Sequence, residues 1–155
     1  MLIMQQDNLK MQFLGGTLYV DIEIWDARTK EFKTAFLNFD TGATVTAISA
    51  DVLDELGYDT SNGKSVKITT ASGTATVQEV IIKKLRIGTN YTLEYVKVYA
   101  HNFPDESFMT GVIGLNVLSQ FDIMLVFSSK IITFSMNAAA DTETASAANK
   151  GSAGN

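Results

Sequence analysis

A carboxylate, a hydroxyl and a glycine follow one another directly after a short apolar run. The run covers residues 36–39 and predicts a strand. Asp40, Thr41 and Gly42 come next and predict a tight loop, in which we expect Gly42 to adopt a backbone conformation that other residues resist. The pattern places one carboxylate at the mouth of a buried strand, in a position to move protons. The alternative is structural, because an aspartate in such a loop also accepts backbone hydrogen bonds in an ordinary turn.

Two further segments follow along the chain. Residues 70–75 are small or polar and contain a glycine, which predicts a hairpin turn between two alternating runs. Residues 111–118 begin with glycine, continue with apolar Val112 and Ile113, and reach Gly114 before a run suited to a short helix. One interpretation of residues 70–75 is an ordinary surface hairpin. The functional interpretation is a lid that closes over a substrate.

In their order and spacing, the three segments resemble the retropepsin-like aspartic proteases, the single-domain form of that protease class. The resemblance extends over residues 18–134 and is closer to cellular and bacterial members than to viral ones. It implies a catalytic loop, a mobile hairpin called the flap, and a second motif packed beneath the loop. The residues that the resemblance assigns are the catalytic Asp40, its loop support Thr41, Gly42 and Ala43, the flap and substrate-binding residues Ala71, Ser72 and Gly73, and the second motif Val112, Ile113 and Gly114.

Two positions depart from the viral pattern. Thr44 follows Ala43 where the viral enzymes carry an acid, and Leu115 follows Gly114 where they carry an arginine. In the viral enzymes this acid and this arginine form an ion pair beside the subunit interface. Its loss here argues against an interface of the viral kind.

The number of catalytic motifs predicts the assembly. The chain offers a single Asp-Thr-Gly, and its 155 residues are too few for two lobes. Hydrolysis by paired carboxylates needs two aspartates, so the resemblance implies a homodimer with two copies of Asp40 on its two-fold axis.

Two carboxylates so close together share one proton. The ionised one takes a proton from a water that attacks the peptide carbonyl, and the protonated one donates to the carbonyl oxygen. Thr41 would hydrogen-bond across the axis, and Gly42 would offer its N–H to the carboxylate.

Two other interpretations remain open at this stage. The same fold would serve as a catalytically silent dimerisation or peptide-binding module, although such a module has no need of the acid. An unrelated β domain could also carry the tripeptide by chance. A serine triad would have to use His101, the single histidine, and no Gly-x-Ser-x-Gly elbow accompanies it.

The remaining sequence predicts an all-β fold, a closed, barrel-like lobe of the retropepsin type. Residues 18–24 alternate between apolar and polar positions, as a half-buried strand does. Two short helices are expected, over residues 50–56 with Ser49 as the N-cap and over residues 115–120. We expect residues 1–136 to form one aspartic protease domain.

Three segments are harder to assign. Residues 1–10 show no clear period, so no strand is predicted there. Residues 74–82 and 85–87 predict two separate strands. Residues 137–155 are rich in alanine, serine and threonine without large apolar side chains, which predicts a disordered tail, with a marginal helix as the alternative.

Composition narrows the possible partners. A net charge of −5 argues against a nucleic-acid surface, because binding phosphates needs clustered lysine and arginine. The absence of cysteine excludes disulfides and thiolate nucleophiles, and with one histidine no zinc site is expected. No cofactor is expected. No apolar run is long enough to span a membrane, and residues 1–7 lack the features of a secretory signal, so a cytoplasmic protein is the expectation. The expected partners are a second copy and a peptide or protein substrate.

Overall fold

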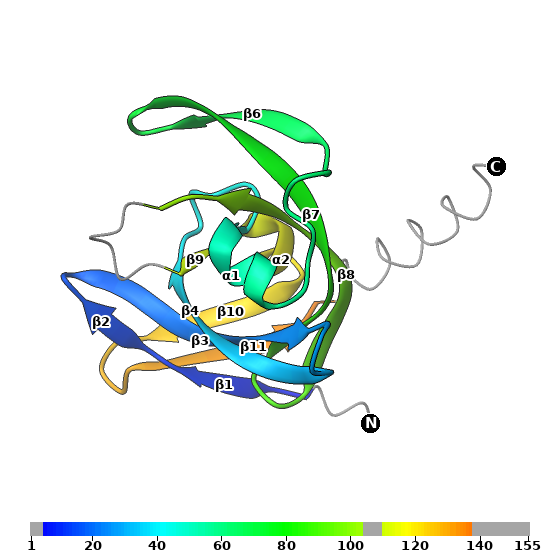
Figure 1. The fold of residues 1–155 in the computed structure, drawn as a ribbon. Coiled ribbons are helices and arrows are strands. Elements are labelled where there is room, and N and C mark those ends of the chain that lie inside the picture. The colour runs from blue at the N-terminus through cyan, green and yellow to red at the C-terminus, as the bar shows by residue number, and fades with distance from the viewer. Residues whose placement is uncertain (1–4, 104–109, 138–155) are drawn as a thin grey trace.

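The molecule is built around a closed barrel of strands (Figure 1). A computed structural model describes residues 5–103 and 110–137. The larger sheet has the order β2-β3-β4-β9-β5-β8-β7-β6, and a further pairing between β3 and β7 closes it into a ring. β2 and β6 are attached outside the ring, so the predicted all-β, barrel-like fold is confirmed. The larger sheet consists of β2 (Gln12–Leu14), β3 (Thr17–Asp26), β4 (Glu31–Phe39), β5 (Ala47–Ser49), β6 (Ser65–Thr70), β7 (Gly73–Ile87), β8 (Tyr91–His101) and β9 (Gly111–Ile113).

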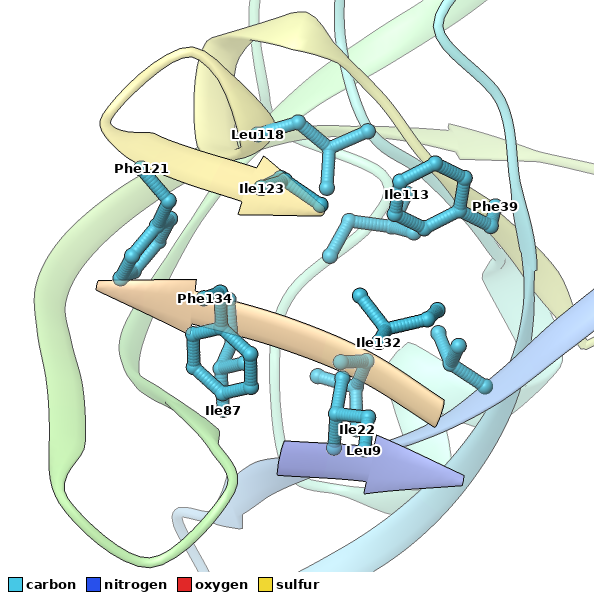
Figure 2. Close-up of a pocket in the computed structure, with 11 residues that line it drawn as sticks. Leu9, Ile22, Phe39, Ile87, Ile113, Leu118, Phe121, Ile123, Ile132 and Phe134 are labelled. Atoms are coloured by element: carbon cyan, nitrogen blue, oxygen red, sulfur yellow. The ribbon is translucent and has the colours of Figure 1, made fainter. Parts of the chain in front are cut away.

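A second, smaller sheet covers one end of the barrel. It has the order β1-β11-β10 and consists of β1 (Asp7–Lys10), β10 (Phe121–Val126) and β11 (Ile131–Met136). Figure 2 shows apolar side chains from this sheet and from the barrel meeting around a small cavity, among them Leu9, Ile22 and Phe134. The cavity has a volume of about 10 Å³, roughly what one water molecule requires. Because its lining is apolar, we interpret it as a packing void of the core and not as a binding site.

The long strand β7 bends between Ile82 and Leu85. Next to the bend, the buried side chains of β7 are Val80 and Ile82 before it and Leu85 and Ile87 after it, so the inward-facing positions change from even to odd there. The regular pairing with β8 is interrupted opposite Tyr95, whose φ of 53° lies in the left-handed region. A single such residue bends a strand and shifts which side chains face the core.

Two predictions about strands were wrong. Residues 74–82 and 85–87 form one continuous strand, β7, because the pairing with β8 continues on both sides of Lys83, whose N–H donates to the Tyr58 hydroxyl at 3.3 Å. The N-terminal segment also contains a strand, β1, where none was predicted. This strand is held by partners that lie far away in the sequence, so no local period reveals it. β1 pairs with β11, and the Asp7 carboxylate accepts hydrogen bonds from the backbone N–H groups of Thr89 and Asn90.

Both short helices are present but end earlier than predicted. α1 covers Ala50–Glu55, and α2 covers Leu115–Leu118. Gly57, with a φ of +85°, follows α1 closely and turns the chain away. Ser49 occupies the predicted N-cap position of α1 but makes no side-chain cap hydrogen bond; it is also the last residue of β5, and its backbone N–H donates to Thr110 O at 2.9 Å.

Residues 138–155 lie outside the described residues, so the domain boundary and the tail stay predictions. The preceding Asn137 is held by hydrogen bonds to the carbonyls of Ser119 and Gln120, both at 3.0 Å. Among the helices of the described ranges, none is long and apolar enough to cross a membrane.

Candidate active site

Asp40 stands immediately after the last residue of β4. Leu37 is fully buried in the barrel core, while Phe39 is partly buried against it, so this end of β4 is anchored in the core. β4 runs parallel to β9, with Asn38 opposite Val112 and Phe39 opposite Ile113. The Asp40 N–H extends this ladder by donating to Ile113 O at 3.1 Å. The backbone of the aspartate is therefore fixed by the second motif.

The loop after the strand folds back onto the carboxylate. The Gly42 N–H donates to Asp40 Oδ1 at 2.8 Å, and the Ala43 N–H donates to Asp40 O at 3.3 Å. The hydrogen bond from Gly42 is the one that the resemblance implied. The reason expected for the glycine was wrong, since Gly42 is not among the residues with positive φ. Instead, a Cβ at this position would lie 3.1 Å from Asp40 Oδ1, so glycine leaves room for the carboxylate.

The second motif lies directly against this loop. Val112 and Ile113 belong to β9, which is inserted between β4 and β5. A Cβ on Gly114 would lie 2.8 Å from Ala43 O and 2.9 Å from the carbonyl carbon of Val45, a distance that no side chain tolerates. At the start of α2, the Leu115 N–H donates to Ala43 O at 2.8 Å. The structure therefore brings both predicted motifs together.

A buried polar network behind the loop was missed by the sequence analysis. Thr46 is fully buried, and both its N–H and its hydroxyl donate to Asn116 Oδ1 at 2.8 Å. The Thr46 hydroxyl also accepts the Gly114 N–H at 3.0 Å, and the Asn116 amide donates to Lys97 O at 2.8 Å. A fully buried hydroxyl such as that of Thr46 requires partners of this kind. The available signal was the position of Asn116, two residues after Gly114 within the second motif.

The predicted flap is the hairpin formed by β6 and the first part of β7. Figure 1 shows it standing out from the barrel. Ala71 and Ser72 form its exposed two-residue turn, and Gly73 follows with a φ of +130°. The Thr70 hydroxyl donates to Gly73 O at 3.0 Å across the turn. Within residues 5–103 and 110–137, the hydrogen bonds of the tip stay inside the hairpin and do not reach Asp40 or the second motif.

The two faces of this hairpin differ in chemistry. Val66 and Ile68 are partly buried, and they pair with Val77 and Ala75 on the opposite strand, so one face is apolar. The other face carries exposed polar side chains, among them Lys67, Thr69, Thr74 and Thr76. An apolar face on a hairpin that projects from the barrel is suited to covering something that lies beside the barrel.

The root of the hairpin is held tightly, in contrast to its tip. A Cβ on Gly63 would lie 2.2 Å from Glu79 O, and the Glu79 N–H donates to Lys64 O at 2.8 Å. Just before this point, Asp59 accepts hydrogen bonds from the backbone N–H of Ser61, the side chain of Asn62 and the hydroxyl of Ser61, which lower the pKa of Asp59 to about 2. The hairpin is therefore preceded by a compact, polar turn.

The described part of the chain offers no metal centre. Within it, no group of three or more histidine, cysteine, aspartate or glutamate side chains is placed to hold a metal ion. The polar groups at the site itself are the Asp40 carboxylate and the backbone N–H groups around it.

Comparisons with known proteins agree with this geometry. The family model described as gag-polyprotein putative aspartyl protease matches residues 26–120, which include Asp40, the hairpin and the second motif. No curated protein matches the chain. Among solved structures, the fold is similar to the crystal structure of a retropepsin-like aspartic protease from Rickettsia conorii, with a TM-score of 0.61 over 88% of this chain and 97% of that one. At 15% sequence identity, this likeness shows a shared fold.

Proposed function

The chain belongs to the gag-polyprotein putative aspartyl protease family, and on that premise we propose that it is an aspartic endopeptidase that works as a homodimer. Two copies of Asp40 activate one water between them and hydrolyse a peptide bond of a peptide or protein substrate. One observation carries the proposal: Asp40 is held rigidly by backbone hydrogen bonds, yet it is only partly buried, and the adjoining Thr41 and Gly42 are exposed. A second loop of the same kind can therefore approach it.

Each residue of the loop has a role in this mechanism. The Gly42 N–H holds the carboxylate to which it donates in a fixed orientation. The dyad of two Asp40 carboxylates shares one proton. Its ionised member removes a proton from water, and its protonated member donates a proton to the oxygen of the substrate carbonyl. Thr41 lies at the exposed side of the loop, where its hydroxyl can bond to the second copy.

The hairpin of β6 and β7 supplies the lid. An extended peptide must enter and leave, and water must be excluded during the reaction, so the cover has to move. Backbone groups at the tip, next to the small residues Ala71, Ser72 and Gly73, would bond the backbone of the peptide. The apolar face of the hairpin would cover the side chains of the substrate.

Digestion of a peptide library, read by mass spectrometry, tests this function. We expect cleavage at internal peptide bonds. We also expect no hydroxamate when hydroxylamine is present, because water attacks directly and no acyl-enzyme forms. Binding of peptides without any cleavage would replace the proposal with the peptide-binding module, and trapping of an acyl group would contradict the mechanism.

A further inference from the structure

A cleft opens between α1 and the end of the β3–β4 hairpin, with a volume of about 390 Å³. We call it the α1 cleft, and the side chains that define it are Asp26, Arg28, Lys33, Ala35, Val52 and Glu55. None of its lining residues belongs to the catalytic loop, the second motif or the flap. Ligand pockets usually measure about 300–1,000 Å³, so the α1 cleft is suited to a small molecule.

Asp26 places an ionised carboxylate in the wall of the cleft. Its side chain is almost completely buried, at 3% exposed for the residue. Burial raises the pKa of Asp26, but hydrogen bonds from Thr29 and from the Arg28 N–H outweigh this effect and keep the pKa below its ordinary value of 3.8. Both backbone N–H groups bond to Oδ1, at 3.1 and 2.8 Å. A carboxylate has about four acceptor sites, so a further donor can bind.

Arg28 stands beside this carboxylate and has donors to spare. Its Nε lies 4.0 Å from Asp26 Oδ1, too far for a hydrogen bond, and its side chain is 62% exposed. The stem of the side chain is close to the backbone of Gly57, where a Cβ would lie 2.6 Å from Arg28 Cγ. A guanidinium binds carboxylates through two parallel N–H donors. The fork of Arg28 is therefore positioned for an anionic group next to Asp26.

Two further charged residues make the lining neutral as a whole. Lys33 lies on β4 and Glu55 on α1. The Lys33 ammonium is already engaged, at 3.3 Å from Glu31 Oε2. Together with Asp26 and Arg28, the lining carries two acids and two bases, in a chain whose net charge is −5. Because a simple ion would meet repelling as well as attracting groups, this lining favours a ligand that carries both charges.

Apolar side chains form another part of the lining. Ala35 and Leu56 are buried and Val52 is half-buried, and all three face the cleft. The Ala27 N–H donates to Leu56 O at 2.8 Å, which ties the β3–β4 turn to the end of α1. The two sides of the cleft are therefore held together before a ligand arrives, and an apolar group that packs between them adds to the affinity.

We propose that the α1 cleft binds a free α-amino acid with an apolar side chain. The two charges of such a ligand are adjacent, as are those of Asp26 and Arg28. Its ammonium group donates to Asp26, its carboxylate accepts from the Arg28 guanidinium, and its side chain packs against Ala35 and Val52. A peptide fits less well, because its two charged ends are further apart. The site is independent of the proposed peptidase function, since it shares no residue with the catalytic loop.

Calorimetric titration with matched ligands tests this site in the whole 155-residue chain. The chain carries Asp40→Asn, so that binding is measured without self-digestion. L-Leucine is compared with 3-methylbutylamine, which lacks the carboxylate, and with 4-methylpentanoate, which lacks the amine. We expect one leucine per chain with a dissociation constant below about 1 mM, and binding of both analogues that is at least about tenfold weaker.

Two substitutions locate the bound leucine. Arg28→Met keeps the stem beside Gly57 but removes the guanidinium, and Asp26→Asn keeps an acceptor for the turn but removes the charge. Each should weaken leucine binding at least about tenfold. The matched controls are Lys30→Met, in the same turn, and Asp54→Asn, on α1; neither residue lines the cleft, and the affinity should stay unchanged. If Asp26→Asn fails to fold by circular dichroism, Arg28→Met decides, because its side chain is mostly exposed.

Four results overturn the proposal. The first is no saturable binding of leucine up to about 10 mM. The second is equal binding of 3-methylbutylamine, which would make the cleft a simple cation site, and the third is equal binding of 4-methylpentanoate, which would make it an anion site. The fourth is unchanged leucine affinity in Arg28→Met, which would place the bound amino acid elsewhere on the molecule.

Discussion

The loop that carries Asp40 and the hairpin of β6 and β7 belong to the same candidate site, but the protein holds them in opposite ways. The loop is bonded to β9, to the start of α2 and to the Thr46–Asn116 network. The hairpin is fixed at its root, while β6 pairs with no strand other than β7 among the described ones. Under the proposed function this difference fits two tasks, because the loop would keep a proton-transferring group in place and the hairpin would open and close.

The largest expected effect comes from Asp40 itself. Asp40→Asn is nearly isosteric, but it removes the only proposed acid and base, so turnover should fall at least about 10³-fold. The melting temperature should stay close to that of the parent. Asp51→Asn, on the exposed face of α1, is the control and should retain activity. Purified Asp40→Asn with full activity would eliminate Asp40 as the catalytic group.

Disrupting the Thr46–Asn116 network behind the loop should mainly reduce the stability of the fold. Thr46→Val keeps the shape but leaves the buried Gly114 N–H without its acceptor, so the free energy of unfolding should fall by about 1–3 kcal/mol. Denaturant titration measures this change. Thr69→Val, at an exposed position of β6, should stay within about 0.5 kcal/mol. Equal effects of the two substitutions would mean that the loop is not fixed through Thr46.

A substitution in the hairpin should affect turnover directly. Gly73 has a φ of +130°, which other residues rarely adopt, although a Cβ there meets nothing within 4 Å. Gly73→Val should strain the exposed tip alone, reducing kcat/KM about tenfold through slower closure. The strained backbone should lower the free energy of unfolding by about 1–3 kcal/mol. Thr74→Val serves as the control, and an unchanged kcat/KM in Gly73→Val would show that the hairpin is not the lid.

The smallest effect concerns the root of the hairpin. The folded-state pKa of Asp59 is about 2, below its ordinary value of 3.8, so the stabilisation by its carboxylate is present above pH 3.8 and is lost as the pH falls toward 2. Hydrogen exchange of the Ser61 and Asn62 amides should speed up over that window, beyond the intrinsic change. In Asp59→Asn this extra change should vanish. If it persists, another group controls the turn.

The pattern of neighbouring residues predicted those elements of the molecule that depend on neighbouring residues alone. The apolar run before Asp40, the tight loop and the hairpin turn could all be recognised from neighbouring residues. The strand β1 could not, because it depends on pairing with β11, far away in the chain. The Thr46–Asn116 bond likewise joins residues 70 positions apart. Thr46 needs this partner because it is buried, and it becomes buried only when the barrel closes.

The site shows the same division. The motif alone suggested Asp40 as the catalytic residue, and this stays a proposal, whereas the reason for glycine at position 42, room for a carboxylate, depends on where the loop folds. The continuity of β7 through Lys83 depends on pairing with β8 on both sides of that residue, which inspection of residues 74–87 alone does not reveal.

One mixing experiment tests the central claim that two copies of Asp40 form one active site. Parent chain and Asp40→Asn are unfolded together in equal amounts, refolded, and assayed for peptide cleavage at constant total concentration. If every active dimer needs two intact aspartates, about one quarter of the activity of the undiluted parent remains, because random pairing gives that share of intact pairs. A remaining activity of one half would mean that each chain acts alone, and it would contradict the account.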